Sequence, residues 1–224
     1  MPEQLEILFE NDHIVAVNKP HGLLVHRSAI DKYATEFALQ ILRKQIGQRV
    51  YPSHRLDRKT SGVLLFTKSK EYNSILQGLF RDRLVVKDYQ AIVRGYISES
   101  GIIDYALKHN DKSQEAKTQY SRLNTFELAV PFGKHDTCRY SLVELRPETG
   151  RFHQLRKHMA HIFHPIIGDR PHGCNKQNRL WKHQFGMDTM MLHAHRLSFK
   201  LDDQSFIIEA PLSQQFQKAL DFLS

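Results

Sequence analysis

The residues best suited to chemistry in this chain lie in the segment 54–62, HRLDRKTSG. It places the carboxylate of Asp57 between the guanidinium groups of Arg55 and Arg58, and an apolar run follows it. The two hydroxyl residues before Gly62 can hydrogen-bond to neighbouring backbone, and Gly62 itself tolerates a positive φ. The segment therefore predicts a rigid corner that holds a single acid at the start of a strand.

Such an acid is limited in what it can do. Nearby cations favour its ionised form, so Asp57 is suited to act as a nucleophile or electrostatic stabiliser and poorly suited to donate a proton. Hydrolysis of a glycosidic bond usually takes two carboxylates, and no second acid stands at an informative spacing. One carboxylate suffices when the leaving group is a stabilised anion. Uracil that departs through N1 is such a group, because its charge spreads onto two carbonyls.

Five blocks of the chain, in the same order, resemble the motifs of the RluA-type pseudouridine synthases. The blocks are 15–22 (VAVNKPHG), 54–62, 87–89 (KDY), 150–156 with 164–169 (GRFHQLR and HPIIGD), and 191–194 (MLHA). The resemblance covers nearly the whole chain. It implies an isomerase in which Asp57 breaks the glycosidic bond of a uridine before the base reattaches through C5, with no metal and no cofactor.

Finer details are similar to the branch of that family that acts on uridine-65 of tRNA. They are the segments 25–28 (VHRS) and 45–48 (QIGQ) and the basic stretch Asp169 to Lys182. This similarity implies tRNA as the partner, and no obligate protein partner is evident. A uridine of ribosomal RNA or another tRNA uridine remains the alternative target.

Composition agrees with this interpretation without requiring it. A chain of 224 residues that is 41% hydrophobic can bury a core, and no Pro/Gly/Ser-rich linker divides it. We expect a single catalytic domain over 1–224, without a separate N-terminal RNA-binding domain, because the first catalytic motif begins near Leu5. The net charge of +8 suits a polyanionic substrate, although ordinary solubility explains the charge equally well.

No apolar run approaches the length of a membrane span, and the N-terminus lacks a basic region followed by an apolar one. We therefore expect a cytoplasmic protein without a membrane partner. Cys138 and Cys174 form no metal or redox motif and are expected to be reduced thiols.

Hydrophobic periodicity predicts an α+β domain. The resemblance implies a large mixed, mostly antiparallel sheet flanked by helices, with a central RNA-binding cleft. The expected strands are 5–9, 14–17, 63–67, 85–97, 117–123, 140–145, 191–201 and 206–209, and the expected helices are 33–46, 69–83, 151–163 and one after Pro211.

Within the expected helix 151–163, Arg156 falls in the middle of an apolar stripe that includes Leu155 and Met159. A buried guanidinium needs an anion, and a planar fork could hold Asp57 bidentately. Alternatively, Arg156 extends its head to water along its methylene stem. The pattern alone leaves these equal, and the resemblance favours the pair.

Three histidines of this segment, His158, His161 and His164, project onto the opposite and wetter face. No HExxH motif and no acid on that helix accompany them, so surface residues are expected rather than a metal site. We expect no metal.

The remaining candidates follow from the resemblance and from chain geometry. Tyr89 of the KDY block is expected to stack on the target base, although a strand tyrosine is more often a core residue. Leu192 is expected to be a wall of the cleft. Lys19 either supports the corner below the site or contacts RNA. Arg55 shares a face with Asp57 in extended chain and can hold a phosphate or fill the space of a flipped nucleotide, although a surface ion pair is the simpler role.

Two other classes of function remain. A catalytically silent RNA-binding module would keep the basic surface without needing the Asp57 corner. A metal-dependent RNA hydrolase would need a cluster of ligands that the sequence does not offer.

Overall fold

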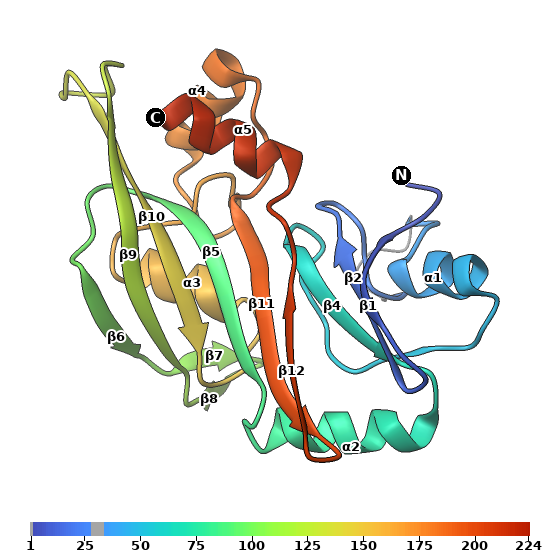
Figure 1. Cartoon of the computed structure of the whole chain (residues 1–224). Helices are drawn as coiled ribbons and strands as arrows, with labels where there is room; N and C mark the ends of the chain where they lie inside the picture. The colour runs from blue at the N-terminus through green and yellow to red at the C-terminus, as the bar shows by residue number, and fades with distance from the viewer. Residues whose placement is uncertain (1, 28–33) are drawn as a thin grey trace. The chain divides into compact units, whose positions relative to one another are not determined.

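The computed structural model describes residues 2–27 and 34–224. They form two compact units. The first comprises the residues up to Lys87 together with Ala194–Ser213, and the second comprises Asp88–His193 with Gln214–Ser224. The fold is α+β, with helices around a large, mostly antiparallel sheet, which confirms the expected class (Figure 1). The expectation of a single catalytic domain stays a prediction.

The first unit is built on antiparallel strands. They are β1 (Glu6–Glu10), β2 (Ile14–Lys19), β3 (Tyr51–Pro52), β4 (Ser61–Thr67), most of β11 (Leu192–Leu201), and β12 (Gln204–Glu209). Strand β2 pairs with β1 and β4, and β12 pairs with β11. The side chain of Asn11 closes the first hairpin, because its Oδ1 accepts hydrogen bonds from the backbone N–H groups of His13 and Ile14.

Two helices belong to this unit. Helix α1 (Ala38–Ile46) ends at Gly47, which adopts φ 64°. The helix predicted from Tyr33 begins at Ala38, and residues 28–33 lie outside the described residues. Helix α2 (Lys70–Arg81) begins where Ser69 accepts a hydrogen bond from the N–H of Tyr72, which confirms the helix predicted over 69–83.

Strand β4 is buried over its whole length. Val63 and Leu65 pack with Leu76 of α2 in one apolar cluster. Leu64 and Phe66 point to the opposite face, since side chains alternate along a strand, and they are also fully buried. The strand that follows the Asp57 corner is therefore enclosed on both sides. Ile75 of α2 is exposed.

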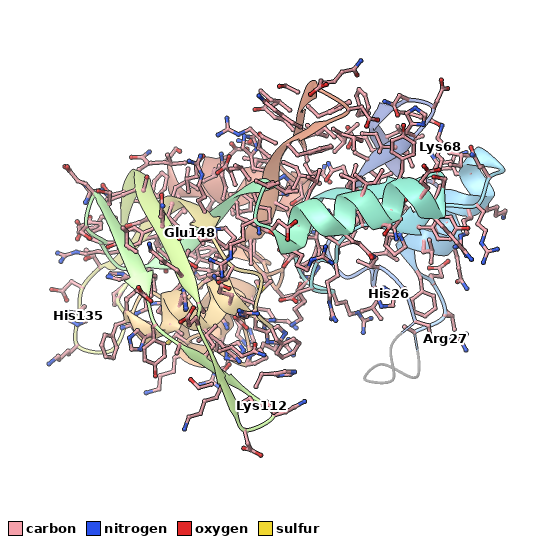
Figure 2. All side chains as sticks on the ribbon, turned by 90° about the horizontal axis from the view of Figure 1, so that it is seen from below. His26, Arg27, Lys68, Lys112, His135 and Glu148 are labelled. Carbon is pink, nitrogen blue, oxygen red and sulfur yellow. The ribbon has the colours of Figure 1, made fainter. Side chains whose placement is uncertain are left out.

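The second unit has its own antiparallel strands. They are β5 (Val86–Arg94), β6 (Ser100–Asp104), β7 (Leu107–His109), β8 (Lys112–Gln114), β9 (Lys117–Leu128) and β10 (Cys138–Pro147). Strand β10 pairs with β5 and β9, and β6 pairs with β9. The β7–β8 hairpin turns at Asn110 and Asp111, both with positive φ, and Figure 2 shows Lys112 at its tip. The sequence analysis did not predict β3, β6, β7 or β8.

The helices of the second unit are α3 (Gln154–His161), α4 (Asn175–Phe185) and α5 (Gln214–Leu223). Leu155 and Met159 of α3 pack against β5 and β10 in a shared cluster, and Figure 1 shows α3 against these strands. Helices α4 and α5 lie side by side, with the rings of Phe185 and Phe222 4.0 Å apart. Helix α4 was not predicted. In the described part of the chain no helix is long and apolar enough to cross a membrane.

The Gly62→Ala variant is expected to lose stability, because a Cβ at this position would lie 2.1 Å from the backbone oxygen of Ala194. Gly62 also adopts φ +107°, a conformation that other residues rarely take. We expect a loss of more than about 2 kcal/mol in the free energy of unfolding. The matched control is Gly78→Ala in α2, where a Cβ meets only ordinary contact, and it should be neutral or stabilising. Equal unfolding curves for the two variants would contradict the prediction.

Candidate active site

Asp57 stands in a tight turn, as the sequence predicted. The N–H of Thr60 donates to the carbonyl of Asp57 over 3.0 Å, which closes the turn just before β4. Leu56 is buried, Asp57 is half-buried and Arg55 is exposed. This alternation agrees with a corner in which Leu56 packs inside while its two neighbours point the other way.

The end of β2 and the segment after it form hydrogen bonds with this corner. The N–H of Gly22 donates to the carbonyl of Arg58 over 2.8 Å, and the Nε of Arg58 donates to the carbonyl of Gly22 over 2.9 Å. The Nζ of Lys19 also donates to the carbonyl of Arg58 over 3.2 Å. The first and second sequence blocks are thus joined by hydrogen bonds immediately beside Asp57.

Lys19 is completely buried. Besides Arg58, its Nζ donates to the carbonyls of Pro20 and Leu23, at 3.0 and 2.8 Å. Burial lowers the pKa of Lys19 from 10.5 to about 7, and the Asp57 carboxylate acts against this shift. An ammonium group satisfied by three carbonyls supports the first of the two predicted roles, support of the corner.

His54 connects the corner to β4. Its Nε2 accepts a hydrogen bond from the N–H of Leu65 over 3.1 Å, and its ring packs on Phe80. Burial, with the charge of Lys87 as a smaller cause, lowers the pKa of His54 to about 4. The imidazole is therefore neutral near pH 7, as an acceptor must be. The sequence analysis assigned His54 no role.

Arg156 is buried within α3, which confirms the helical projection on this point. Its Nε donates to Asp169 Oδ2 over 2.8 Å and its Nη2 donates to Asp169 Oδ1 over 2.7 Å. Asp169 is 1% exposed. The bidentate fork that was expected to hold Asp57 holds Asp169 at this edge of the guanidinium. The projection identified the need for an anion, but a pattern within one helix cannot say which loop supplies it.

The predicted limits of this helix were too wide. His153 adopts φ 56°, so the helix begins at Gln154 and ends at His161. Phe152 and Phe163, which fall inside the predicted range, consequently lie outside the helix, and Phe163 is 86% exposed.

The expectation that His158 lies on the solvent-facing side of the helix is wrong. His158 is fully buried, with Nδ1 2.9 Å from Thr118 Oγ1 and Nε2 3.0 Å from the carbonyl of Tyr105. Burial lowers its pKa. His161, by contrast, is exposed and stacks on Tyr105.

Tyr89 and Leu192 belong to one apolar cluster with Leu155 and Met159 of α3. Tyr89 is partly buried and Leu192 is 2% exposed. The structure therefore brings these two predicted site residues together with the helix that carries Arg156. Their contact with a substrate stays a prediction.

Further hydrogen bonds stabilise the surroundings of α3 and Tyr89. They are formed by side chains to which the sequence analysis gave no role. The Nε2 of Gln154 donates to the carbonyl of Lys117, and its Oε1 accepts from the hydroxyl of Thr149. Asp88, next to Tyr89, accepts from the Nε of Arg146 over 2.7 Å. Both acids, Asp88 and Asp169, stand inside the quoted motifs, which is the signal that could have identified them.

Among the residues that the structure describes, no group of three or more His, Cys, Asp or Glu side chains is arranged to hold a metal ion.

The RNA pseudouridylate synthase family matches residues 13–161, more than half of the chain. The chain belongs to this family. It is thus a pseudouridine synthase, an isomerase of uridine in RNA.

Relatives match almost the entire synthase. It is 45% identical to tRNA pseudouridine synthase C of Vibrio parahaemolyticus, over 97% of this chain and 94% of the relative. It is 49% identical to tRNA pseudouridine synthase C of Pasteurella multocida, over 95% and 93%.

Solved structures agree with the fold. The structure of human RNA Pseudouridylate Synthase Domain Containing 4 matches with a TM-score of 0.75 and 26% identity, over 97% of this chain and 92% of that one. Human RNA Pseudouridylate Synthase Domain Containing 1 matches with a TM-score of 0.76 and 24% identity, over 99% and 95%.

The Asp169→Asn variant should lower the stability of the synthase by about 3–5 kcal/mol, because it removes the buried carboxylate that binds the buried guanidinium of Arg156 through two hydrogen bonds. The matched control is Asp188→Asn, which removes the partner of Lys182 from a pair that is more than half exposed, and it should cost less than about 1 kcal/mol. Denaturant unfolding measures both. Similar losses in the two variants would show that the buried pair carries no special weight.

Lys19 should impose a pH dependence on stability. The pKa of Lys19 is about 7 in the folded protein, against its ordinary value of 10.5 in an unfolded chain, so the unfolded chain binds more protons between these limits. Stability should therefore rise with pH from about 7 upward, by roughly 1.4 kcal/mol per pH unit from this group. Unfolding of the parent and of Lys19→Met between pH 7 and 10 measures the difference, with the exposed Lys44→Met as control. Parallel pH curves for the parent and Lys19→Met would refute the assignment.

Proposed function

We propose that this synthase converts uridine-65 of tRNA to pseudouridine, with Asp57 as the catalytic carboxylate and without a metal or an organic cofactor. The observation that carries the proposal is the match, over nearly the full length of both chains, to relatives named tRNA pseudouridine synthase C. The finer choice of uridine-65 rests on the resemblance in the segments 25–28 and 45–48 and in the basic stretch Asp169 to Lys182. Ser28 of the first segment lies outside the described residues.

Asp57 acts at C1′ of the target uridine. It attacks this carbon or stabilises its oxocarbenium character while the C1′–N1 bond breaks and the electron pair leaves with uracil. The uracil stays in the site and rotates, C5 bonds to C1′, the proton on C5 is lost, and N1 gains a proton. No redox equivalent is consumed, which is why the reaction needs no cofactor. Hydrogen bonds from the segment Lys19–Leu23 support the corner against displacement.

Arg156 holds Asp57 in this proposal. Asp169 binds the Nε–Nη2 edge of the guanidinium and so fixes its plane. The family resemblance is what assigns the Asp57 carboxylate to Arg156 as well. Arg156 would then lie between two acids, with Asp169 as the positioning partner and Asp57 as the catalytic one.

The other candidates contact the substrate. A uridine in a stem must be extruded from the helix before C1′ can be reached, at a cost of a few kcal/mol. Tyr89 stacks on the extruded base and Leu192 forms the wall behind it. Arg55, which is exposed beside Asp57, binds the phosphate of this nucleotide or fills the vacated space.

The proposal places the enzyme in the cytoplasm, where tRNA is, and requires no protein partner. Maps of pseudouridine in RNA from cells that lack the protein test the target. Loss of the modification at position 65 of tRNA supports it, whereas loss at a ribosomal or another tRNA uridine would replace the target and keep the chemistry.

The Asp57→Asn variant is expected to bind tRNA within about a fewfold of the parent and to form no pseudouridine, because it removes the charge and keeps the shape. The control is Asp82→Asn, an exposed acid at the end of α2, which should retain full activity. Single-turnover assays on unmodified tRNA transcript measure both. Turnover by purified Asp57→Asn would remove this residue from the mechanism.

A further inference from the structure

Helix α4 has one side fixed in the second unit. Gln177 and Trp181 are 2% and 1% exposed. The hydroxyl of Tyr140 donates to Gln177 Oε1 over 2.7 Å, and the ring of Trp181 stands edge-on to that of Tyr140. Helix α4 is therefore anchored to β10 through its buried side.

The other side of α4 is exposed and basic. It carries Lys176, Arg179, Lys182 and His183, and the helix contains no acidic residue. Lys176, Arg179 and His183 follow at a spacing of three and four, so they share one face over about 10 Å of the helix axis. The Nζ of Lys182 forms an ion pair with Asp188 Oδ2 over 3.6 Å. Within the described residues no acid forms an ion pair with Lys176 or Arg179.

This distribution of charge does not serve the helix itself. Like charges three or four residues apart destabilise a helix, and a cation in the first turn opposes the helix dipole, where acids are favourable. Lys176 stands in that first turn. A face that only kept the protein soluble would gain from paired acids, so the unpaired cations indicate an external anion.

A chain of contacts fixes the position of this face relative to Arg156. The Oδ1 of Asn178 accepts from the N–H of Gly168, and its Nδ2 donates to the carbonyl of Asp169, both over 2.8 Å. The carboxylate of Asp169 holds Arg156. The loop is tightly packed, because a Cβ on Gly173 would lie 1.9 Å from the carbonyl oxygen of Asp169.

We infer that the exposed face of α4, formed by Lys176, Arg179 and His183, binds backbone phosphates of the RNA substrate away from the nucleotide that reacts. This inference rests on the proposed function. Phosphate contacts carry no sequence information but fix the register of a protein on a nucleic acid. Because Asn178 and Asp169 connect α4 to Arg156, such a contact selects the uridine that lies at the correct distance along the RNA.

The test compares two double variants of equal charge. Lys176→Gln with Arg179→Gln removes the α4 cations, and Lys200→Gln with Lys218→Gln removes two exposed cations from β11 and α5. The dissociation constant for unmodified tRNA transcript is measured over a range of salt concentrations, with the single-turnover rate at saturating enzyme. Thermal unfolding should show the α4 variant as stable as the parent or more so, since it loses only repulsion.

The α4 variant is expected to bind about tenfold more weakly at low salt, and the slope of log K against log salt should fall by roughly 2 in magnitude. Its rate at saturation should stay within about twofold of the parent, because the docking face does not touch the reacting atoms. The β11/α5 variant should keep the parental slope. If the two variants have the same affinity for tRNA and the same slope of log K against log salt, the exposed face of α4 does not bind the RNA. A parent that makes no pseudouridine in the transcript would instead overturn the proposed function, and the binding slopes would still decide the role of α4.

Discussion

The pair between Arg156 and Asp169 is the interaction on which the arrangement of α3, the loop after it and α4 depends. Two charges, each nearly excluded from water, remain stable there only because the guanidinium and carboxylate meet through two short hydrogen bonds. The pair ties α3 to the loop that begins at Gly168, and Asn178 continues the connection to α4. Helix α3 and the basic surface helix α4 are therefore parts of one hydrogen-bonded network.

In the first unit, the buried side chain of Lys19 stabilises the turn that carries Asp57. Buried or partly buried carbonyls next to the Asp57 turn need hydrogen-bond donors, and the ammonium group of Lys19 satisfies three of them at once. Burial makes its protonated form costly, which is visible in its lowered pKa. The buried ammonium group of Lys19 therefore holds the carbonyls of Pro20, Leu23 and Arg58 together beside the corner.

Much of this could be predicted from the sequence, and the failures have physical causes. Strands β2 and β4 could be located because they are short apolar runs that are buried almost throughout, and α2 because Tyr72, Leu76, Leu79 and Phe80 recur at helical spacing. Apolar periodicity failed at α4, where only Gln177 and Trp181 are buried and charged residues fill the remaining face. It also placed His158 in water, because a buried imidazole with two polar partners looks the same in sequence as a solvated one. The Asp57 turn was predictable from its local residues, whereas the Asp169 partner of Arg156 depends on a loop that returns from outside the helix.

The close approach of Gly62 to Ala194 has a consequence for how the protein folds during its synthesis. The first unit is discontinuous, since its residues up to Lys87 are joined by Ala194–Ser213 only after the whole intervening segment. On the ribosome, at about 5–20 residues per second, the backbone that packs against Gly62 appears roughly 7 to 26 seconds after Gly62 itself. During that interval β4 lacks its neighbouring strand β11. An apolar strand with an unpaired edge is prone to pair with the strand of another chain. The packing around the Asp57 corner can therefore be completed only after residue 194 has emerged.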